Sequence, residues 1–95
     1  MSHEHPADHR AQLSRVNRIE GQVKGVKNMI EEGMYCVDIL TQIKAVRSAL
    51  KGLELQILEG HAEHCLLSAV TSGNKEIAQE KISEILELIK KSSKS

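Results

Sequence analysis

Apolar side chains recur every three or four positions along most of this 95-residue chain, which is the spacing of one face of an α-helix. The first such stretch is formed by Leu13, Val16, Ile19, Val23, Val26 and Ile30. Pro6 and Asp8 suit the first turn of a helix, and Gly33 can adopt the left-handed conformation that ends one. We therefore predict a helix that begins near these first-turn residues and ends near Gly33.

A second and longer run lies between residues 35 and 70 and contains no proline. Its apolar positions are Ile39, Ile43, Val46, Leu50, Leu53, Ile57 and Leu58. The turn-forming sequence Ser72-Gly73-Asn74 precedes a third helix, which carries Ile77, Ile82, Ile85, Leu86 and Ile89. No stretch has the alternation of a β-strand. The predicted fold class is all-α, with a polar tail over residues 1–9, a helical domain over 10–90 and a polar tail over 91–95.

The composition limits the kind of core that the chain can form. Tyr35 is the only aromatic residue, so the core must consist of Leu, Ile and Val. A chain this short buries a modest share of its surface alone, so helices that complete their core by forming oligomers fit better than a compact monomer. The two cysteines are distant, and the sequence contains neither a signal peptide nor an apolar run of membrane-spanning length. We expect a soluble cytoplasmic protein with free thiols and no membrane partner.

Charge is distributed unevenly along the chain. Residues 10–51 contain eight Lys and Arg against four acids, whereas residues 52–89 contain two Lys against seven Glu. Arg15, Arg18 and Gln22 share a stripe of the first helix, and Lys44 and Arg47 lie on the second. These side chains suit contacts with DNA, in which cations bind phosphates and Gln can reach a base edge. The alternative is an ordinary solvated helix surface.

The cysteines pose a geometric problem. Cys36 and His61 are 25 residues apart, so a continuous helix separates them by about 37 Å and one chain cannot bring them to one site. His61 and Cys65 are an i,i+4 pair on one helix face. If two such helices pack antiparallel about a midpoint near residues 49–51, Cys36 of one chain becomes level with residues 61–65 of the other.

Two thiolates and one imidazole form a soft ligand set that suits Cu(I), or Zn(II) if a fourth ligand joins. Taken singly, a free Cys is often a buried apolar residue, and a His near a helix end often only forms hydrogen bonds. His3, His5 and His9 could add a ligand, although histidines in a short tail are more often solvated. No phosphate loop, nucleophile elbow or HExxH sequence is present, so we do not expect an enzyme.

The segments LSRVNRIEGQVKGVKNMI, YCVDILTQIKAV and HAEHC resemble the copper-sensitive operon repressor family, which also includes nickel/cobalt, formaldehyde and persulfide sensors. The resemblance covers roughly residues 10 to 90. It implies a three-helix protomer that forms an antiparallel four-helix-bundle dimer, commonly paired into a homotetramer. It also implies binding to operator DNA without a helix-turn-helix and release of that DNA when the effector binds.

The resemblance also extends to single residues. Cys36, His61 and Cys65 match the ligands of the Cu(I) sensors, with the first on one chain and the other two on its partner. Tyr35 matches a position beside those ligands. The residues that match the basic DNA face are Arg15, Arg18, Gln22, Lys44 and Arg47. The chain departs from the family at Lys81, where the resemblance implies a glutamate that supports the site, although Glu80 and Glu84 are nearby.

These observations favour a repressor that responds to Cu(I). Persulfide sensing is an alternative that leaves His61 without a role. Nickel or cobalt sensing would favour histidine in place of Cys65 and would use a histidine such as His3. Outside the family, a copper-buffering protein would use the same ligands but leave the Arg15 and Arg18 stripe idle. A purely structural helical oligomer would require both the ligand spacing and the charge asymmetry to be accidental.

Overall fold

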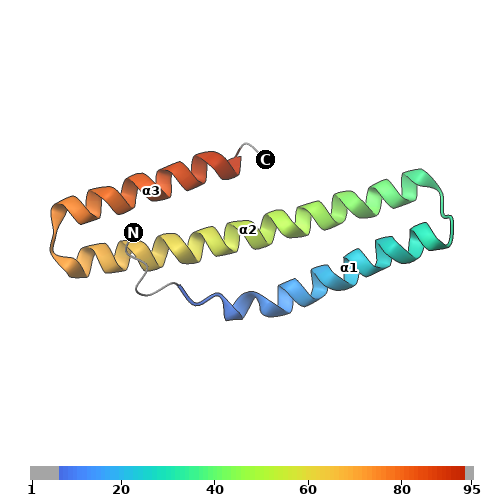
Figure 1. The fold of residues 1–95 in the computed structure, drawn as a ribbon, viewed down its shortest axis with the longest axis horizontal. Helices are drawn as coiled ribbons and strands as arrows, with labels where there is room; N and C mark the ends of the chain where they lie inside the picture. Colours follow the sequence, from blue (N-terminus) through green and yellow to red (C-terminus); the bar gives the residue numbers. More distant parts are fainter. Residues whose placement is uncertain (1–6, 94–95) are drawn as a thin grey trace. The chain divides into compact units, whose positions relative to one another are not determined.

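The structure is a computed structural model that describes residues 7–93 of the chain. A single 3-10 turn, η1 (Arg10–Gln12), is followed by three α-helices: α1 (Leu13–Glu31), α2 (Cys36–Ser72) and α3 (Lys75–Ser93) (Figure 1). No strand occurs among these residues. The prediction of an all-α, three-helix protomer is therefore confirmed.

The helix ends follow local chemistry. Gly33 has a φ of 67°, and the backbone N–H of Met34 donates to the carbonyl of Met29 at 3.0 Å, so α1 ends as predicted in a left-handed glycine turn. Gly73 has a φ of 68°, and the Asn74 Oδ1 atom accepts a hydrogen bond from the N–H of Glu76 at 2.9 Å, which caps α3.

The predicted start of the first helix was too early. The α-helix begins at Leu13, after η1, and its N-cap residue Gln12 makes no side-chain capping bond. Without a capping side chain to hold the free N–H groups, the first turn adopts the tighter 3-10 form. The predicted role of Pro6 lies outside the described residues.

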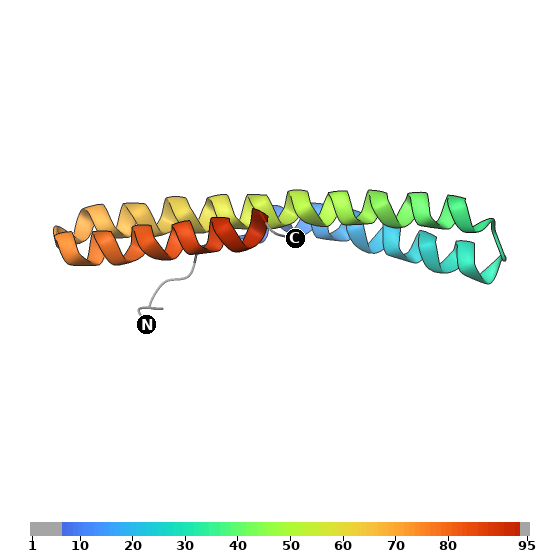
Figure 2. The ribbon, with the colours of Figure 1, turned by 90° about the horizontal axis from the view of Figure 1, so that it is seen from above.

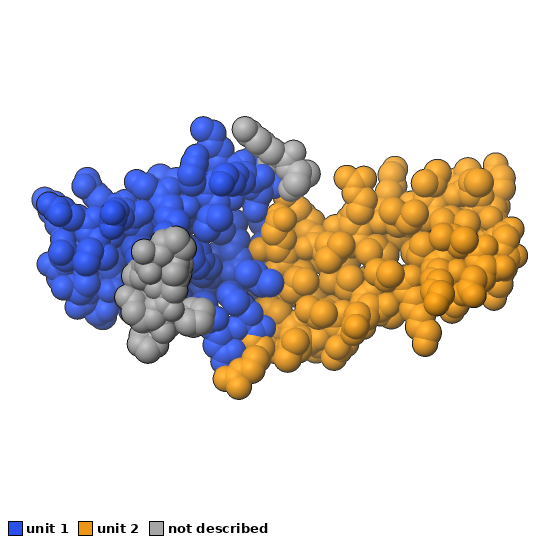
Figure 3. Space-filling view, viewed as in Figure 1, with its two compact units in different colours: residues 1–9, 55–95 blue, residues 10–54 orange. Residues whose placement is uncertain are grey.

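The chain divides into two compact units, one formed by residues 10–54 and the other by residues 1–9 and 55–95 (Figure 3). In the first unit, α1 lies antiparallel to the beginning of α2, with Ile19 and Val46 buried. In the second, α3 lies antiparallel to the end of α2 in both views, and Cys65, Ala69 and Ile85 are buried (Figure 2). Each unit is thus a helical hairpin with a small core.

Many apolar side chains of these hairpins remain exposed, among them Leu13 at 56% and Ile30 at 60%. A groove of about 580 Å³ runs between α1 and α2, which we call the α1–α2 groove. Its lining residues are Val16, Ile19, Glu20, Val23, Lys24, Lys27, Leu50 and Leu53. Within residues 7–93, no helix combines the length and apolar character that a membrane span requires.

Candidate metal centre

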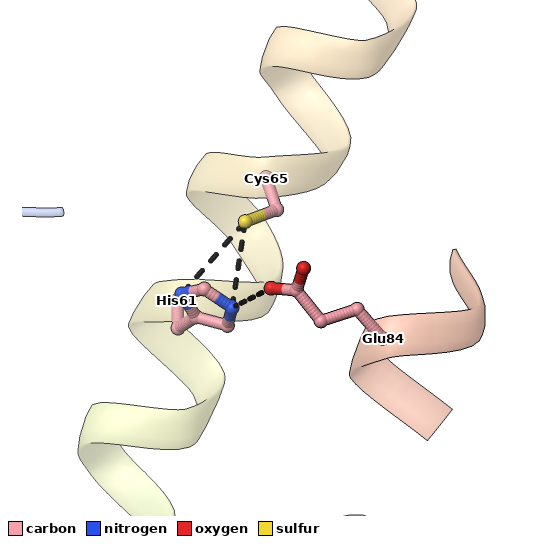
Figure 4. A network of polar contacts seen from close by, with 3 residues as sticks. All are labelled: His61, Cys65 and Glu84. Atoms are coloured by element: carbon pink, nitrogen blue, oxygen red, sulfur yellow. Dashed lines mark hydrogen bonds and ion pairs between the residues drawn. The ribbon is translucent and has the colours of Figure 1, made fainter. Parts of the chain in front are cut away.

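Three potential metal ligands meet where α3 packs against the end of α2. The Cys65 Sγ atom lies 3.7 Å from Nδ1 and 3.5 Å from Nε2 of His61, and the His61 Nε2 atom lies 3.1 Å from Oε1 of Glu84 (Figure 4). One ligand atom from each residue falls within 4.8 Å of the others. The three residues therefore offer donor atoms that lie close enough together to bind one metal ion.

Helix geometry explains why these three residues meet. His61 and Cys65 are one turn apart on the same face of α2. His61 precedes Gly73 by 12 residues and Glu84 follows it by 11, so the antiparallel hairpin brings them level. Ile85, next to Glu84, and Ala69, one turn after Cys65, are both buried in this hairpin.

Burial differs across the site. Cys65 is only 6% exposed, whereas the side chains of His61 and Glu84 are 32% and 49% exposed. Burial raises the pKa of the Cys65 thiol, with the positive charge of Lys81 lowering it and the negative charge of Glu84 raising it. Without a metal, the thiol therefore favours its neutral form, and metal binding must displace its proton.

The spacing of sulfur and nitrogen fits shared coordination. In zinc sites, a sulfur at about 2.3 Å and a nitrogen at about 2.0 Å, seen from the metal at about 110° to 120°, lie about 3.5 to 3.7 Å apart. The observed separations of 3.5 and 3.7 Å fall within this range. A carboxylate accepts hydrogen bonds, so the neutral imidazole that satisfies this contact carries its proton on Nε2 and presents the Nδ1 lone pair to a metal.

The third predicted ligand is not part of this group. Cys36 is an exposed free thiol at the first residue of α2 and belongs to the other unit. Its neighbour Tyr35 is 70% exposed. Within one chain, the structure thus brings together two of the three predicted ligands, and sharing of Cys36 between chains stays a prediction.

Glu84 was missed as the residue that supports His61. We expected that role at position 81, one turn earlier on α3, where this chain has Lys81. The contact from Glu84 to His61 shows that a carboxylate is present after all. Counting residues outward from the glycine of the Ser72-Gly73-Asn74 turn would have found it.

The predicted DNA-binding side chains all lie in the unit formed by residues 10–54. Arg18, Lys44 and Arg47 are exposed. Arg15 is also exposed, and its Nη1 atom lies so close to α2 that a methyl group on Gly52 would approach it to 3.3 Å. Gln22 is half-buried, and its Oε1 atom is buried and has no hydrogen-bond partner among the described residues.

The histidines of the N-terminal tail are only partly described. His3 and His5 lie outside the described residues. The ring of His9 packs against Gly60, where an added methyl group would lie 3.3 Å from the imidazole Cε1 atom. His9 is not one of the three clustered ligands.

Comparison with known proteins identifies the family. A family model described as metal-sensitive transcriptional repressor matches residues 8–91. The copper-sensing transcriptional repressor CsoR of Bacillus subtilis (strain 168) is 52% identical over 82 residues, which are 86% of this chain and 78% of that protein. CsoR of Mycobacterium tuberculosis (strain ATCC 25618 / H37Rv) is 37% identical over 90 residues, which are 95% of this chain and 73% of that protein.

Two solved structures of metal-responsive regulators have a fold similar to that of this chain. The copper-sensing repressor CsoR with Cu(I) from Geobacillus thermodenitrificans NG80-2 has a TM-score of 0.76 and 37% identity, covering 94% of this chain and 93% of that one. The nickel-responsive transcriptional regulator InrS has a TM-score of 0.75 and 32% identity, covering 95% and 99%. Sequence, fold and family model therefore agree that this chain belongs to the metal-sensitive transcriptional repressor family.

Proposed function

We propose that this protein is a Cu(I)-responsive transcriptional repressor that binds operator double-stranded DNA when metal-free and releases it when Cu(I) binds. Its family supports the repressor role, and its copper-sensing relatives support copper as the effector. The observation that carries the proposal is the spacing of the His61 and Cys65 ligand atoms. Such a protein needs no enzymatic activity, and it acts in the cytoplasm, where it can reach its operator.

The proposed site combines His61 and Cys65 of one protomer with Cys36 of the partner subunit. Two thiolates and an imidazole are soft ligands that suit a low-coordinate Cu(I) ion. Glu84 holds the His61 ring through its Nε2 atom. Tyr35 adjoins Cys36 in the sequence and therefore lies beside the proposed site.

A homodimer supplies this arrangement, and two dimers assemble into a tetramer. The apolar α1–α2 groove and the exposed Leu13, Val23 and Ile30 side chains support this assembly, because their burial against a second copy removes apolar surface from water. These side chains are 51% to 60% exposed in one chain, so burying the remainder of each contributes about half of the full-burial value, or about 0.8 to 1.5 kcal/mol. The proposed antiparallel four-helix bundle uses α1 and α2 of both protomers.

The proposed DNA surface belongs to residues 10–54. Its members are Arg15, Arg18, Gln22, Lys44 and Arg47. Neutralising DNA phosphates releases counterions, so affinity falls steeply as salt increases. The Cu(I) complex has lower affinity for DNA, and by linkage DNA lowers the affinity for Cu(I) by the same factor.

A nickel-responsive repressor is the second candidate, because the fold is similar to that of the nickel-responsive regulator InrS. The Glu84 carboxylate also lies close enough to His61 and Cys65 to act as a further oxygen ligand. A divalent ion with four or more ligands would use that oxygen, whereas a low-coordinate Cu(I) ion does not need it.

Anaerobic fluorescence anisotropy tests the proposal. Labelled DNA from the promoter region of the protein's own gene is bound by the metal-free protein, and Cu(I) is then titrated in. We expect release at one Cu(I) per protomer, with no release at that ratio in the Cys65→Ala variant. His64→Ala is a matched control, because this residue lies on the same helix but outside the three clustered ligands.

The outcomes separate the candidates. Release by Ni(II) but not by Cu(I) would replace copper with nickel, and release only by a persulfide donor would identify a thiol sensor. DNA that is never bound, despite tight Cu(I) binding, would indicate a copper-buffering role.

A further inference from the structure

Lys81 lies level with the buried thiol of the metal centre. It follows Gly73 by eight residues, and Cys65 precedes Gly73 by eight. It is also one turn before Glu84 on α3, and Glu84 contacts His61, which is one turn before Cys65 on α2. In an antiparallel hairpin, one turn back along α3 corresponds to one turn forward along α2. This register places Lys81 beside Cys65.

The charge of Lys81 acts on this sulfur. Lys81 is half-buried, so its field is less screened than that of a fully exposed lysine. The lysine charge lowers the pKa of the Cys65 thiol, and Glu84 acts in the opposite sense. The two α3 side chains therefore place opposite charges beside the candidate ligands.

A fixed positive charge distinguishes metals by their valence. Two thiolates and a neutral imidazole form a complex of net charge −1 with Cu(I), but a neutral complex with a divalent ion. The ammonium group attracts the first complex and has no net charge to attract in the second. Its effect on the divalent complex is therefore smaller.

We propose that Lys81 is a specificity-determining residue that favours monovalent over divalent ions at the His61/Cys65 centre. This inference rests on the proposed function and names the charge class of its effector. Lys81 acts through the field at the thiolates and does not itself coordinate the ion. A glutamate at position 81 would act in the opposite sense and lower the ratio of Cu(I) to divalent-ion affinity, since two carboxylates would then adjoin the site.

The test compares three substitutions that differ in charge: Lys81→Gln, Lys81→Glu and Lys81→Arg. Cu(I) affinity is measured anaerobically by competition with the chromogenic chelator bicinchoninate, and Ni(II) affinity by thiolate charge-transfer absorbance. Lys90→Gln on the same helix is the matched control. Thermal unfolding of each metal-free variant, followed by circular dichroism, checks that the hairpin remains folded.

We expect the ratio of Cu(I) to Ni(II) affinity to fall about three- to tenfold in Lys81→Gln, the range for a partly exposed charge interaction. It should fall further in Lys81→Glu and return to the wild-type value in Lys81→Arg. The differences should shrink only in part in 1 M salt, because a half-buried charge is screened less than an exposed one. The Lys90→Gln ratio should equal that of the wild type.

An unchanged ratio in both Lys81→Gln and Lys81→Glu would overturn the proposal. So would equal loss of both affinities, since that result indicates lost packing and not a charge effect. Failure of the proposed function is distinguishable, because the wild-type protein and all three position-81 variants would then keep their DNA when Cu(I) is added. The affinity ratio would still report on Lys81 in that case.

Discussion

We predict that the affinity for Cu(I) depends on the hydrogen bond between His61 and Glu84. Replacing Glu84 by Ala removes the acceptor that holds the His61 Nε2 atom at 3.1 Å. The imidazole can then rotate away from Cys65, and Nδ1 loses its fixed direction toward a metal. We expect Cu(I) to bind more weakly, although neither proposed thiolate ligand has changed.

The magnitude follows from burial and from two opposing effects. Changes to a residue that orients a metal-bound histidine cost about 10- to 100-fold in affinity. Glu84 is 49% exposed and water can partly replace it, so we expect the lower end, about tenfold or about 1.4 kcal/mol. Losing this carboxylate also lowers the pKa of the Cys65 thiol, which favours binding. Glu84 is the smallest of the three influences on this thiol, and we expect the loss of orientation to outweigh this gain.

Anaerobic competition with bicinchoninate measures this change. Glu84→Gln should lose less affinity than Glu84→Ala, because the amide oxygen can still accept the hydrogen bond. Glu87→Gln removes an exposed carboxylate one turn further along α3 and should match the wild type. Wild-type or higher affinity in Glu84→Ala would refute the idea that this carboxylate orients the ligand.

Three further predictions concern the shared metal site, the DNA surface and the buried thiol. Mixing Cys36→Ala and Cys65→Ala protomers should restore about one Cu(I) site per mixed dimer, although each variant alone binds no Cu(I) tightly. Metal titration of the mixture measures this site, and a mixture that binds no Cu(I) would contradict a site shared between chains. Arg18→Ala should weaken DNA binding and reduce the slope of log affinity against log salt concentration by about one. Anisotropy at several salt concentrations measures this slope, and an unaltered slope would show that Arg18 is not part of the DNA interface. The free energy of unfolding of the metal-free protein should decline as pH rises above 9.0, the ordinary pKa of the Cys65 thiol. The pKa of this thiol is raised in the folded protein, so the unfolded chain loses the proton first. Urea titrations should show a smaller decline in Cys65→Ala, and an equal decline would contradict a role for this thiol.

The helices could be predicted from the sequence because apolar periodicity is a local property. Gly33 and the Ser72-Gly73-Asn74 turn marked helix ends correctly, since backbone conformation there depends on one or two residues. The start of α1 could not be predicted as well. It depends on which N–H groups find partners, and Gln12 provides no side-chain cap.

The candidate site was only partly predictable. The pairing of His61 with Cys65 follows from helix geometry alone. Whether position 81 or 84 supports His61 depends on the register between two helices, and both positions share one face of α3. Gln22 shows a similar limit, because a periodic pattern places a residue on a stripe but does not reveal which side-chain atom is covered.

The contrast between the two cysteines has a practical consequence for studying assembly. In the isolated chain, an alkylating reagent can reach the exposed Cys36 thiol, whereas Cys65 is covered. A partner that brings its own His61 and Cys65 to Cys36 would shield this thiol, and a bound ion would shield it further. The rate at which this one thiol per chain is alkylated therefore reports how much of the protein is paired, and the measurement needs no DNA.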